Sequence, residues 1–154
     1  HDTEIIGPIS VKLWASSSAV DTDFTAKLID VYPSSRDFPA GFDLIMGDGI
    51  IRARYRDSDK EEKLMTPGEI YEFTIKLDPC CNVFKKGHRI RVDISSSNFP
   101  RWDVNPNTGE PLGRATSRRA QRALQPVRGG PGGRARCGGA PPAPRRAPGP
   151  STPI

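Results

Sequence analysis

The sequence lacks the features of a membrane protein and of a disulfide-stabilised protein. No apolar run approaches the ~20 residues that a membrane-spanning helix needs, and no charged-then-apolar signal segment opens the chain. The three cysteines, Cys80, Cys81 and Cys137, form no C-x-x-C pair, and adjacent Cys80 and Cys81 do not suit an ordinary structural disulfide. This cysteine usage argues against a disulfide framework or a zinc site. It favours a reducing compartment, and we expect a cytoplasmic protein without membrane partners.

Acidic residues and aromatics are absent from residues 112–154, which contain nine arginines. Gly, Ala, Arg and Pro make up 32 of these 43 positions, with no period of two or of 3.6. Such a composition cannot bury enough apolar surface to offset the entropy of ordering the chain. We therefore predict a disordered basic tail at 112–154. A shifted reading frame in GC-rich DNA would produce the same abrupt change in composition, and both explanations stay open.

Residues 1–111 differ from the tail in charge and in pattern. They hold fourteen basic and eighteen acidic residues, a formal charge of −4, whereas the tail carries +9. Apolar and polar side chains alternate at 9–13, 24–28, 51–56, 71–77 and 89–94, most clearly where Tyr71, Phe73, Ile75 and Leu77 alternate with Glu72, Thr74 and Lys76. Alternation of this kind places one face of a strand on a core and the other in water.

The spacing of turn residues indicates how these strands are connected. Glycine-rich or proline-containing turns separate them at 47–49, 67–68 and 85–87, and no stretch has the pattern of an amphipathic helix. Strands without crossover helices form antiparallel sheets. Residues 1–111 are therefore predicted to be an all-β domain, an antiparallel jelly-roll-like sandwich. Phe24, Ala26 and Leu28 share one face of their strand, and the opposite face carries Ile29 and Val31 beside Thr25 and Lys27, so that strand is expected to be covered on both sides.

Candidate catalytic residues are few. A serine hydrolase needs an exposed nucleophile, often in G-x-S-x-G, and a base within reach, but no G-x-S-x-G occurs. His88, in the strand entry that follows Gly87, is interpreted as a turn residue whose ring bonds to nearby backbone rather than as a general base. The serine runs 16–18 and 95–97 follow strands and are interpreted as turn residues. We predict no catalytic residue in this chain.

Other polar clusters also have structural interpretations. Asp21 and Asp23 could suggest a calcium loop, but further ligands and the loop glycine are missing, so a turn and a strand start are favoured. Residues 105–109 are rich in turn formers and are expected to form a loop. No metal or cofactor site is predicted. Arg52, Arg54 and Arg56 alternate with apolar residues and are expected to form a solvated strand face. Carboxylates on a neighbouring strand or an acidic partner are the two kinds of group with which these arginines could pair.

Two further binding functions remain as alternatives. Trp14 and Trp102 could form a sugar-stacking platform, although a tryptophan on the face opposite Val11 and Leu13 more often packs under a neighbouring domain. In the tail, the Arg-Gly-Gly and Gly-Gly-Arg segments at 128–134 resemble RNA-binding sequences, but without the aromatic residues that usually stack on bases. Charge alone would attract nucleic acid without specificity.

Seven blocks, taken in order, resemble one protein family. They are residues 13–18 (LWASSS), 21–28 with 30–33 (DTDFTAKL and DVYP), 48–56 (DGIIRARYR), 67–71 (PGEIY), 82–92 (NVFKKGHRIRV), 95–101 (SSSNFPR) and 105–109 (NPNTG). In this order they resemble the C-terminal domain of the X-prolyl dipeptidyl-peptidase and cocaine esterase hydrolases, over residues 5 to about 113. Cys80 and Cys81 stand where that family tends to have small polar residues. Residues 114–154 do not resemble the family's ending, which has further β-structure.

The resemblance implies a jelly-roll (galactose-binding-like) domain that packs on an upstream α/β-hydrolase domain bearing a Ser-Asp-His triad. No catalytic residue of the family maps onto this chain. We therefore expect an accessory domain at 1–111 that is truncated at both ends. At its C-terminal end the family's further β-structure is missing, and at its N-terminal end the sequence begins at His1 without methionine. This domain would help to shape the substrate entrance of an esterase or dipeptidyl-peptidase and be inactive alone. The resemblance leaves a homo-oligomer open and implies no specific nucleic-acid partner.

Overall fold

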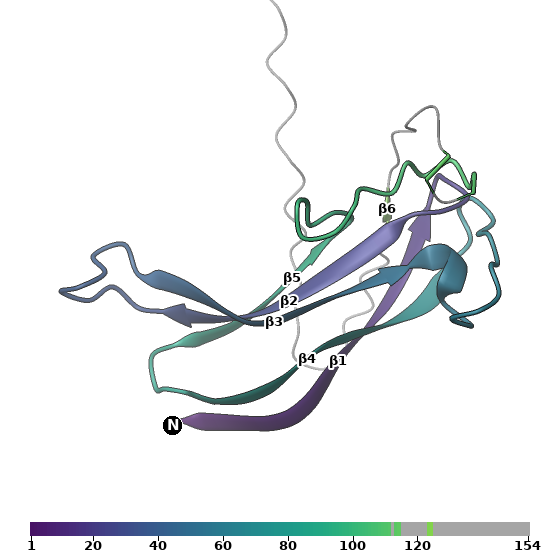
Figure 1. Ribbon diagram of the computed structural model, residues 1–154. Helices are drawn as coiled ribbons and strands as arrows, with labels where there is room; N and C mark the ends of the chain where they lie inside the picture. Colours follow the sequence, from purple (N-terminus) through teal and green to yellow (C-terminus); the bar gives the residue numbers. More distant parts are fainter. Residues whose placement is uncertain (112, 115–122, 125–154) are drawn as a thin grey trace, which may run out of the picture.

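The computed structural model describes residues 1–111, 113–114 and 123–124 (Figure 1). The described elements are β1 (Thr3–Ser17), β2 (Asp23–Tyr32), β3 (Phe42–Arg52), the 3-10 turn η1 (Ala53–Tyr55), β4 (Tyr71–Phe84), β5 (Arg89–Ser95) and the two-residue β6 (Ala123–Leu124). The predicted tail lies outside the described residues except at 113–114 and 123–124.

The strands form two three-stranded sheets, which confirms the predicted all-β sandwich. The first has the order β4-β1-β6 and the second the order β3-β2-β5, and every neighbouring pair is antiparallel. Figure 1 shows β2 and β3 continuing into a long hairpin that projects from the sandwich. Within the part of the chain that the structure describes, the short turn η1, which the sequence did not predict, is the only helical element.

The core lies between the sheets and is built from alternate residues of the strands. In β4 the side chains of Phe73, Ile75 and Leu77 are buried, whereas Glu72, Thr74 and Lys76 are exposed, as alternation predicts. The ring of Phe73 packs against that of Phe24 in β2, with centroids 4.9 Å apart. Side chains on both faces of β2 are buried, which confirms the prediction that this strand is covered on both sides.

Two glycines bring the sheets into contact along one side of the sandwich. A Cβ atom on Gly49 of β3 would lie 2.0 Å from the carbonyl oxygen of Lys76 in β4, and one on Gly47 would lie 3.0 Å from that of Asp78. A side chain at Gly49 therefore cannot fit without a backbone shift. This contact places β3 of one sheet against β4 of the other. The strands at the far ends of the two sheets, β5 and β6, therefore lie at the opposite side of the sandwich.

The strand predicted at 51–56 is wrong beyond Arg52. The chain leaves β3 there and forms η1, so Arg54 does not point from a strand face into solvent. Its side chain is instead buried, because the carboxylate of Asp21 accepts hydrogen bonds from both its backbone N–H and its guanidinium. The expectation of pairing with neighbouring carboxylates is confirmed for Arg52 and Arg54.

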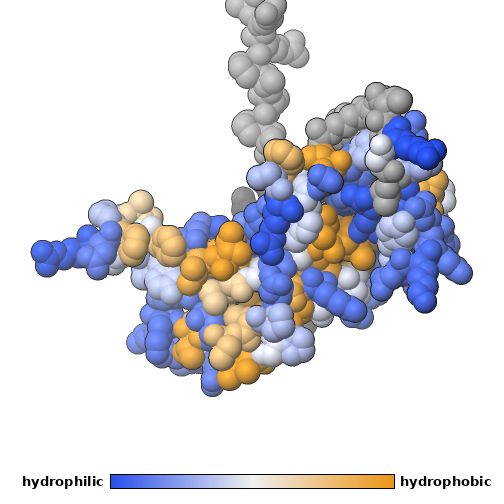
Figure 2. Space-filling model, in the orientation of Figure 1, coloured by the Kyte–Doolittle hydropathy of each residue, from blue (hydrophilic) through white to orange (hydrophobic). Residues whose placement is uncertain are grey.

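The opposite side of the sandwich is less well covered. Ile90 and Val92 of β5 lie on the same face of the sheet as the core residues Leu28 and Ala26, yet 49% and 47% of their surfaces remain exposed. Figure 2 shows hydrophobic surface in several patches between charged residues, including near the base of the projecting hairpin. The inward direction of these β5 side chains agrees with the sequence pattern, but their exposure does not.

Candidate functional site

His88 lies at the end of the sandwich, where β4 turns into β5. Its backbone N–H donates to the Lys85 carbonyl at 2.9 Å, which agrees with a turn position. Its ring does not bond to backbone as predicted: Nδ1 lies 2.9 Å from Oδ1 of Asp30 in β2. Asn82 Nδ2 donates to the other carboxylate oxygen of Asp30 at 3.2 Å, and the Tyr32 ring packs on the imidazole with centroids 4.2 Å apart.

This His–Asp pair has the orientation of a general base, but no nucleophile accompanies it. Among the described residues, no hydrogen bond joins His88 to a serine hydroxyl. In the two serine runs, Ser95 Oγ donates to the Ser97 carbonyl at 2.8 Å, and Ser17 Oγ accepts from the Ala19 N–H at 3.0 Å. The turn interpretation is wrong for Ser16 and Ser17, which belong to β1, and for Ser95, which belongs to β5; it holds for the serines that follow these strand ends. The pair of His88 and Asp30 therefore connects β2 with the β4–β5 turn.

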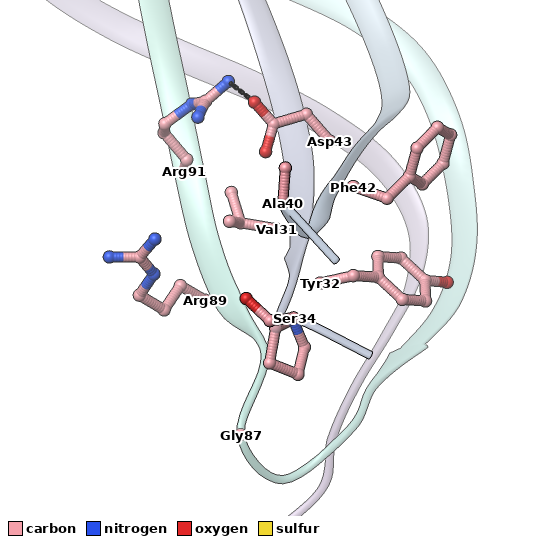
Figure 3. A pocket seen from close by; sticks show the side chains of 10 residues that line it. Val31, Tyr32, Ser34, Ala40, Phe42, Asp43, Gly87, Arg89 and Arg91 are labelled. Atoms are coloured by element: carbon pink, nitrogen blue, oxygen red, sulfur yellow. Dashed lines mark hydrogen bonds and ion pairs between the residues drawn. The ribbon is translucent and has the colours of Figure 1, made fainter. Parts of the chain in front are cut away.

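An open pocket of about 470 Å³ lies beside the same turn (Figure 3). Its walls come from the end of β2, the start of β3 and the first residues of β5. Arg91 Nη2 donates to Asp43 Oδ2 at 2.8 Å across the pocket, and this hydrogen bond raises the pKa of Arg91. Figure 3 shows Arg89 extending away from Asp43, and no ion pair joins Arg89 to a described residue. The pocket holds no nucleophile–base pair.

A buried polar cluster at the other end of the sandwich is the most enclosed group of charges. Asp21 is 0% exposed and Arg54 1%, and Arg54 Nε donates to Asp21 Oδ2 at 2.8 Å. Arg52 binds Asp23 through both Nε and Nη2, at 2.9 and 3.0 Å. The hydrogen bond to Asp23 raises the pKa of Arg52. Asn105 Nδ2 donates to Asp21 at 3.0 Å and to Asp23 at 2.8 Å, which joins the two ion pairs.

The role of this buried cluster is structural. It attaches η1 and the loop around Asn105 to the start of β2, because the Arg54 guanidinium also donates to the Glu110 carbonyl at 3.1 Å. The predictions of a strand start at Asp23 and a loop at 105–109 are confirmed. Sequence reasoning did not predict that these segments meet. The available signal was that Asp21 and Asp23 are two residues apart, as are Arg52 and Arg54, so that two ion pairs can form side by side. No group of three or more potential metal ligands lies together within the described ranges.

The two tryptophans differ in their surroundings. Trp14 is 50% exposed on the outer face of β1, opposite Glu72 in β4. Beside it, Lys12 Nζ and Glu72 Oε1 lie 3.1 Å apart. Trp102 lies in the loop after β5, with the Arg101 guanidinium 5.1 Å from its ring centre. Trp14 is the more accessible ring, because Trp102 is partly buried, and the outward side chains beside Trp14 on β1 and β4 are polar.

No helix in the described part of the chain is long and apolar enough to cross a membrane. The described cysteines are both free thiols: Cys80 is buried and Cys81 is exposed. Burial raises the pKa of the Cys80 thiol. The described part of the sandwich therefore contains buried polar clusters, open surface pockets and several exposed apolar side chains.

Comparisons with known proteins give a consistent result. The family model of the X-Pro dipeptidyl-peptidase C-terminal non-catalytic domain matches residues 1–128. Cocaine esterase of Rhodococcus sp. (strain MB1 Bresler) is 45% identical over 128 residues, which cover 83% of this chain and 21% of the esterase.

Two solved structures share the fold over most of the chain. An alpha-amino acid ester hydrolase matches with a TM-score of 0.77 and 33% identity, covering 82% of this chain and 22% of that one. An aminopeptidase from a marine sediment Thaumarchaeota archaeon matches with a TM-score of 0.73 and 31% identity, covering 80% and 21%. The chain thus spans about a fifth of the length of the relatives that it matches.

Proposed function

Because the chain belongs to the family of X-Pro dipeptidyl-peptidase C-terminal non-catalytic domains, we propose that it serves as the accessory domain of a serine hydrolase. In this proposal, residues 1–111 form the accessory domain and 112–154 a basic extension. The domain packs on an upstream α/β-hydrolase domain and helps to shape the substrate entrance. The complete protein cleaves esters or X-Pro amides in the cytoplasm, and its oligomeric state is left open.

The observation that carries the proposal is the exposed apolar surface of a domain whose described residues show no nucleophile–base pair. Eleven large hydrophobic side chains among the described residues have between 38 and 70% of their surface exposed. Where such side chains gather into a patch, as Figure 2 shows near the base of the projecting hairpin, they commonly mark an interface. The match to about a fifth of the length of larger hydrolases supplies the class of partner.

Trp14 is the side chain that we propose as an anchor on the hydrolase domain. Its ring is half exposed on the flat outer face of β1 and β4, and tryptophan is common among the residues that dominate interfaces. The polar neighbours Lys12 and Glu72 would form the rim of such a contact. Packing of this face leaves the other end of the sandwich, with Asp30 and His88, outside the contact.

A direct assay tests whether the chain is catalytic. The purified chain is incubated with p-nitrophenyl esters and with X-Pro p-nitroanilides, and hydrolysis is followed by absorbance. We expect no turnover above buffer. Turnover that co-purifies with the chain and disappears in a His88→Ala variant would refute the accessory role.

A chimera tests the packing. The chain replaces the matched region of Rhodococcus cocaine esterase, and the thermal midpoint and the KM for a p-nitrophenyl ester are measured with and without Trp14→Ala. We expect Trp14→Ala to lower the midpoint and to change KM. Thr74→Ala, at an exposed position of β4 on the same outer face, is the control and should change neither. Equal behaviour of the two variants would show that this face does not pack on the hydrolase.

The exposure of Trp14 also supports a second function, a carbohydrate-binding module. A half-exposed indole on a flat, polar sheet face can stack on a sugar ring. Titration of the isolated chain with soluble oligosaccharides, followed by tryptophan fluorescence, separates the two functions. A saturable change that is lost in Trp14→Ala would favour carbohydrate binding over packing on a hydrolase.

A further inference from the structure

Three polar groups line the open pocket beside the β4–β5 turn without a bonding partner. They are the guanidinium of Arg89 in β5, the hydroxyl of Ser34 in the β2–β3 hairpin and Oδ1 of Asp43 in β3. Within the described residues no hydrogen bond or ion pair reaches any of the three, because Asp43 binds Arg91 through its other oxygen. Residues 112, 115–122 and 125–154 contain no aspartate or glutamate, so the rest of the chain supplies no acidic side chain to Arg89 either.

The second arginine of the pocket is already neutralised. Arg91 Nη2 donates to Asp43 Oδ2 at 2.8 Å, and Arg91 Nε lies 3.2 Å from Asp93 Oδ1 in an ion pair whose angle does not suit a hydrogen bond. Arg91 thus lies between two carboxylates, which together outweigh its charge. Arg89, two residues away on the same face of β5, is therefore the cation that a bound anion would meet.

The register of the sheet sets the distance between the two ends of the pocket. Val31 of β2 pairs with Arg89 on one side and with Asp43 on the other. The Cα atoms of Arg89 and Asp43 are therefore two inter-strand spacings apart, about 10 Å. Figure 3 shows the Arg89 side chain extending away from Asp43 and the Ser34 hydroxyl pointing toward the side that Arg89 forms. The pocket has a positive end and a negative end, with the buried side chain of Val31 between them.

Contacts on the other face of the sheet hold this pocket in shape. His88, which precedes Arg89, binds Asp30 through Nδ1 at 2.9 Å, and its ring packs on that of Tyr32 with centroids 4.2 Å apart. Asp30 and Tyr32 are the neighbours of Val31 in β2. The start of β5 is therefore fixed on β2 without a ligand, which lowers the ordering cost of binding.

We propose that this pocket binds a short zwitterionic peptide of the length of a dipeptide. The peptide carboxylate accepts hydrogen bonds from the Arg89 guanidinium and the Ser34 hydroxyl, and the ammonium group donates to Asp43 Oδ1. The apolar side chains of the peptide lie over Val31 and Ala40. The proposal does not rest on the proposed function, because all of these groups belong to the sandwich and its hairpin.

The size of the pocket agrees with this ligand. Its volume of about 470 Å³ lies in the range of small-molecule sites. An extended dipeptide spans about 7 Å, and a hydrogen bond of about 3 Å at each end extends its reach to about 13 Å. That reach suits two charged side chains whose Cα atoms are about 10 Å apart and of which one extends away from the other. A free amino acid is about 3.5 Å shorter and contacts only one end.

A titration of the intact, isotope-labelled chain with L-alanyl-L-leucine tests the pocket by two-dimensional proton–nitrogen NMR. We expect saturable shifts of the backbone amide signals of Ser34 and Arg89, with a dissociation constant of about 1 mM. N-acetyl-Ala-Leu lacks the ammonium group and Ala-Leu amide lacks the carboxylate. Each should bind about fivefold more weakly, as expected for the loss of one exposed ion pair. Equal affinity for the three ligands, or no saturable shift up to about 20 mM, would overturn the proposal.

Two protein variants assign the carboxylate to its arginine. Arg89→Gln should bind Ala-Leu and Ala-Leu amide with the same affinity, because the side chain that distinguishes them is gone. Arg36→Gln is the matched control: Arg36 is also an exposed arginine without an ion pair in the described part of the chain, but it lies outside the pocket lining. This control should keep the fivefold preference. Circular dichroism verifies that both variants fold. A preference that survives Arg89→Gln, or that Arg36→Gln removes, would place the carboxylate elsewhere and refute the proposal.

Two further ligands separate a peptide site from a general anion site. Inorganic phosphate carries negative charge without an ammonium group, and leucine carries both charges on a shorter molecule. We expect both to bind more weakly than Ala-Leu and to shift the Arg89 signal less at equal concentration. Binding of phosphate or of leucine as tight as that of Ala-Leu would refute a site with the length of a dipeptide.

Discussion

Arg54 shows how far a local pattern can mislead at the scale of a residue. Arg52, Arg54 and Arg56 alternate with apolar residues as a solvated strand face would. The burial of Arg54 depends on Asp21, 33 positions away, and on Asn105, which completes the hydrogen bonds of that carboxylate. Alternation describes one segment alone, so it cannot reveal a partner distant in sequence. It could predict that arginines and carboxylates pair, but not which arginine is enclosed.

Replacement of Arg54 by methionine tests this buried ion pair. Methionine keeps the length of the side chain but leaves the Asp21 carboxylate buried without its cation, which costs about 3–5 kcal/mol. Urea unfolding followed by circular dichroism measures the loss. Arg91→Met is the matched control, because Arg91 and Asp43 are both about half exposed, and it should cost less than about 1 kcal/mol. Equal losses would mean that burial does not distinguish the two pairs.

The adjacent cysteines provide a second prediction at this scale. Cys80 is buried and the pKa of its thiol is raised, whereas the Cys81 side chain is exposed. Because the thiolate is the reactive form, iodoacetamide at pH 8 should label Cys81 much faster than Cys80. Mass spectrometry of tryptic peptides measures the ratio. Comparable labelling in urea is the control, and comparable labelling of the native protein would contradict the burial of Cys80.

At the scale of the element, glycine determines where the two sheets meet. The sequence predicted a turn at 47–49 because Gly-Asp-Gly is typical of turns, but these residues lie within β3. The glycines serve a different purpose, since the backbone of β4 occupies the space of a side chain at Gly49. A close approach between segments distant in sequence leaves no local trace except the glycine itself.

Substitution of Gly49 by alanine should therefore disturb the contact between the sheets. A Cβ at Gly49 would lie 2.0 Å from the Lys76 carbonyl oxygen, so β3 and β4 must separate, at a cost of at least about 1–3 kcal/mol. Gly47→Ala is the control, because its Cβ would lie 3.0 Å from the Asp78 oxygen and requires only a small shift. Urea midpoints of the two variants give the comparison. A larger loss for Gly47→Ala would show that the sheets are not held by this contact.

At the scale of the whole molecule, alternation predicted the sandwich, whereas the signal for a poorly covered side was the lack of resemblance between residues 114–154 and the family's β-rich ending. The alternation of apolar and polar side chains in 9–13 and 71–77 predicts which side chains face inward. The lack of helical patterns restricts the fold to sheets. Whether a strand lies opposite Ile90 and Val92 depends on the order of strands in the other sheet, which alternation does not contain. The candidate site shows the same division, because His88 was identified as a turn residue but its partner Asp30 was not.

The charge of the whole chain is divided between two unlike segments, and this division predicts how it binds polyanions. Residues 112–154 carry nine arginines and no acidic residue, so truncation after Pro111 changes the formal charge from +5 to −4. Binding to single-stranded poly-U, measured by fluorescence polarisation, should weaken with added salt in the full chain, with a log–log slope of about −6 if all nine arginines contact phosphates. The truncated chain should show no such binding. Poly-A serves as the sequence control and should bind like poly-U, because charge alone does not discriminate bases. Retained, salt-sensitive binding by the truncated chain would place the polyanion site on the sandwich, where Arg89 lies without an acidic partner among the described residues.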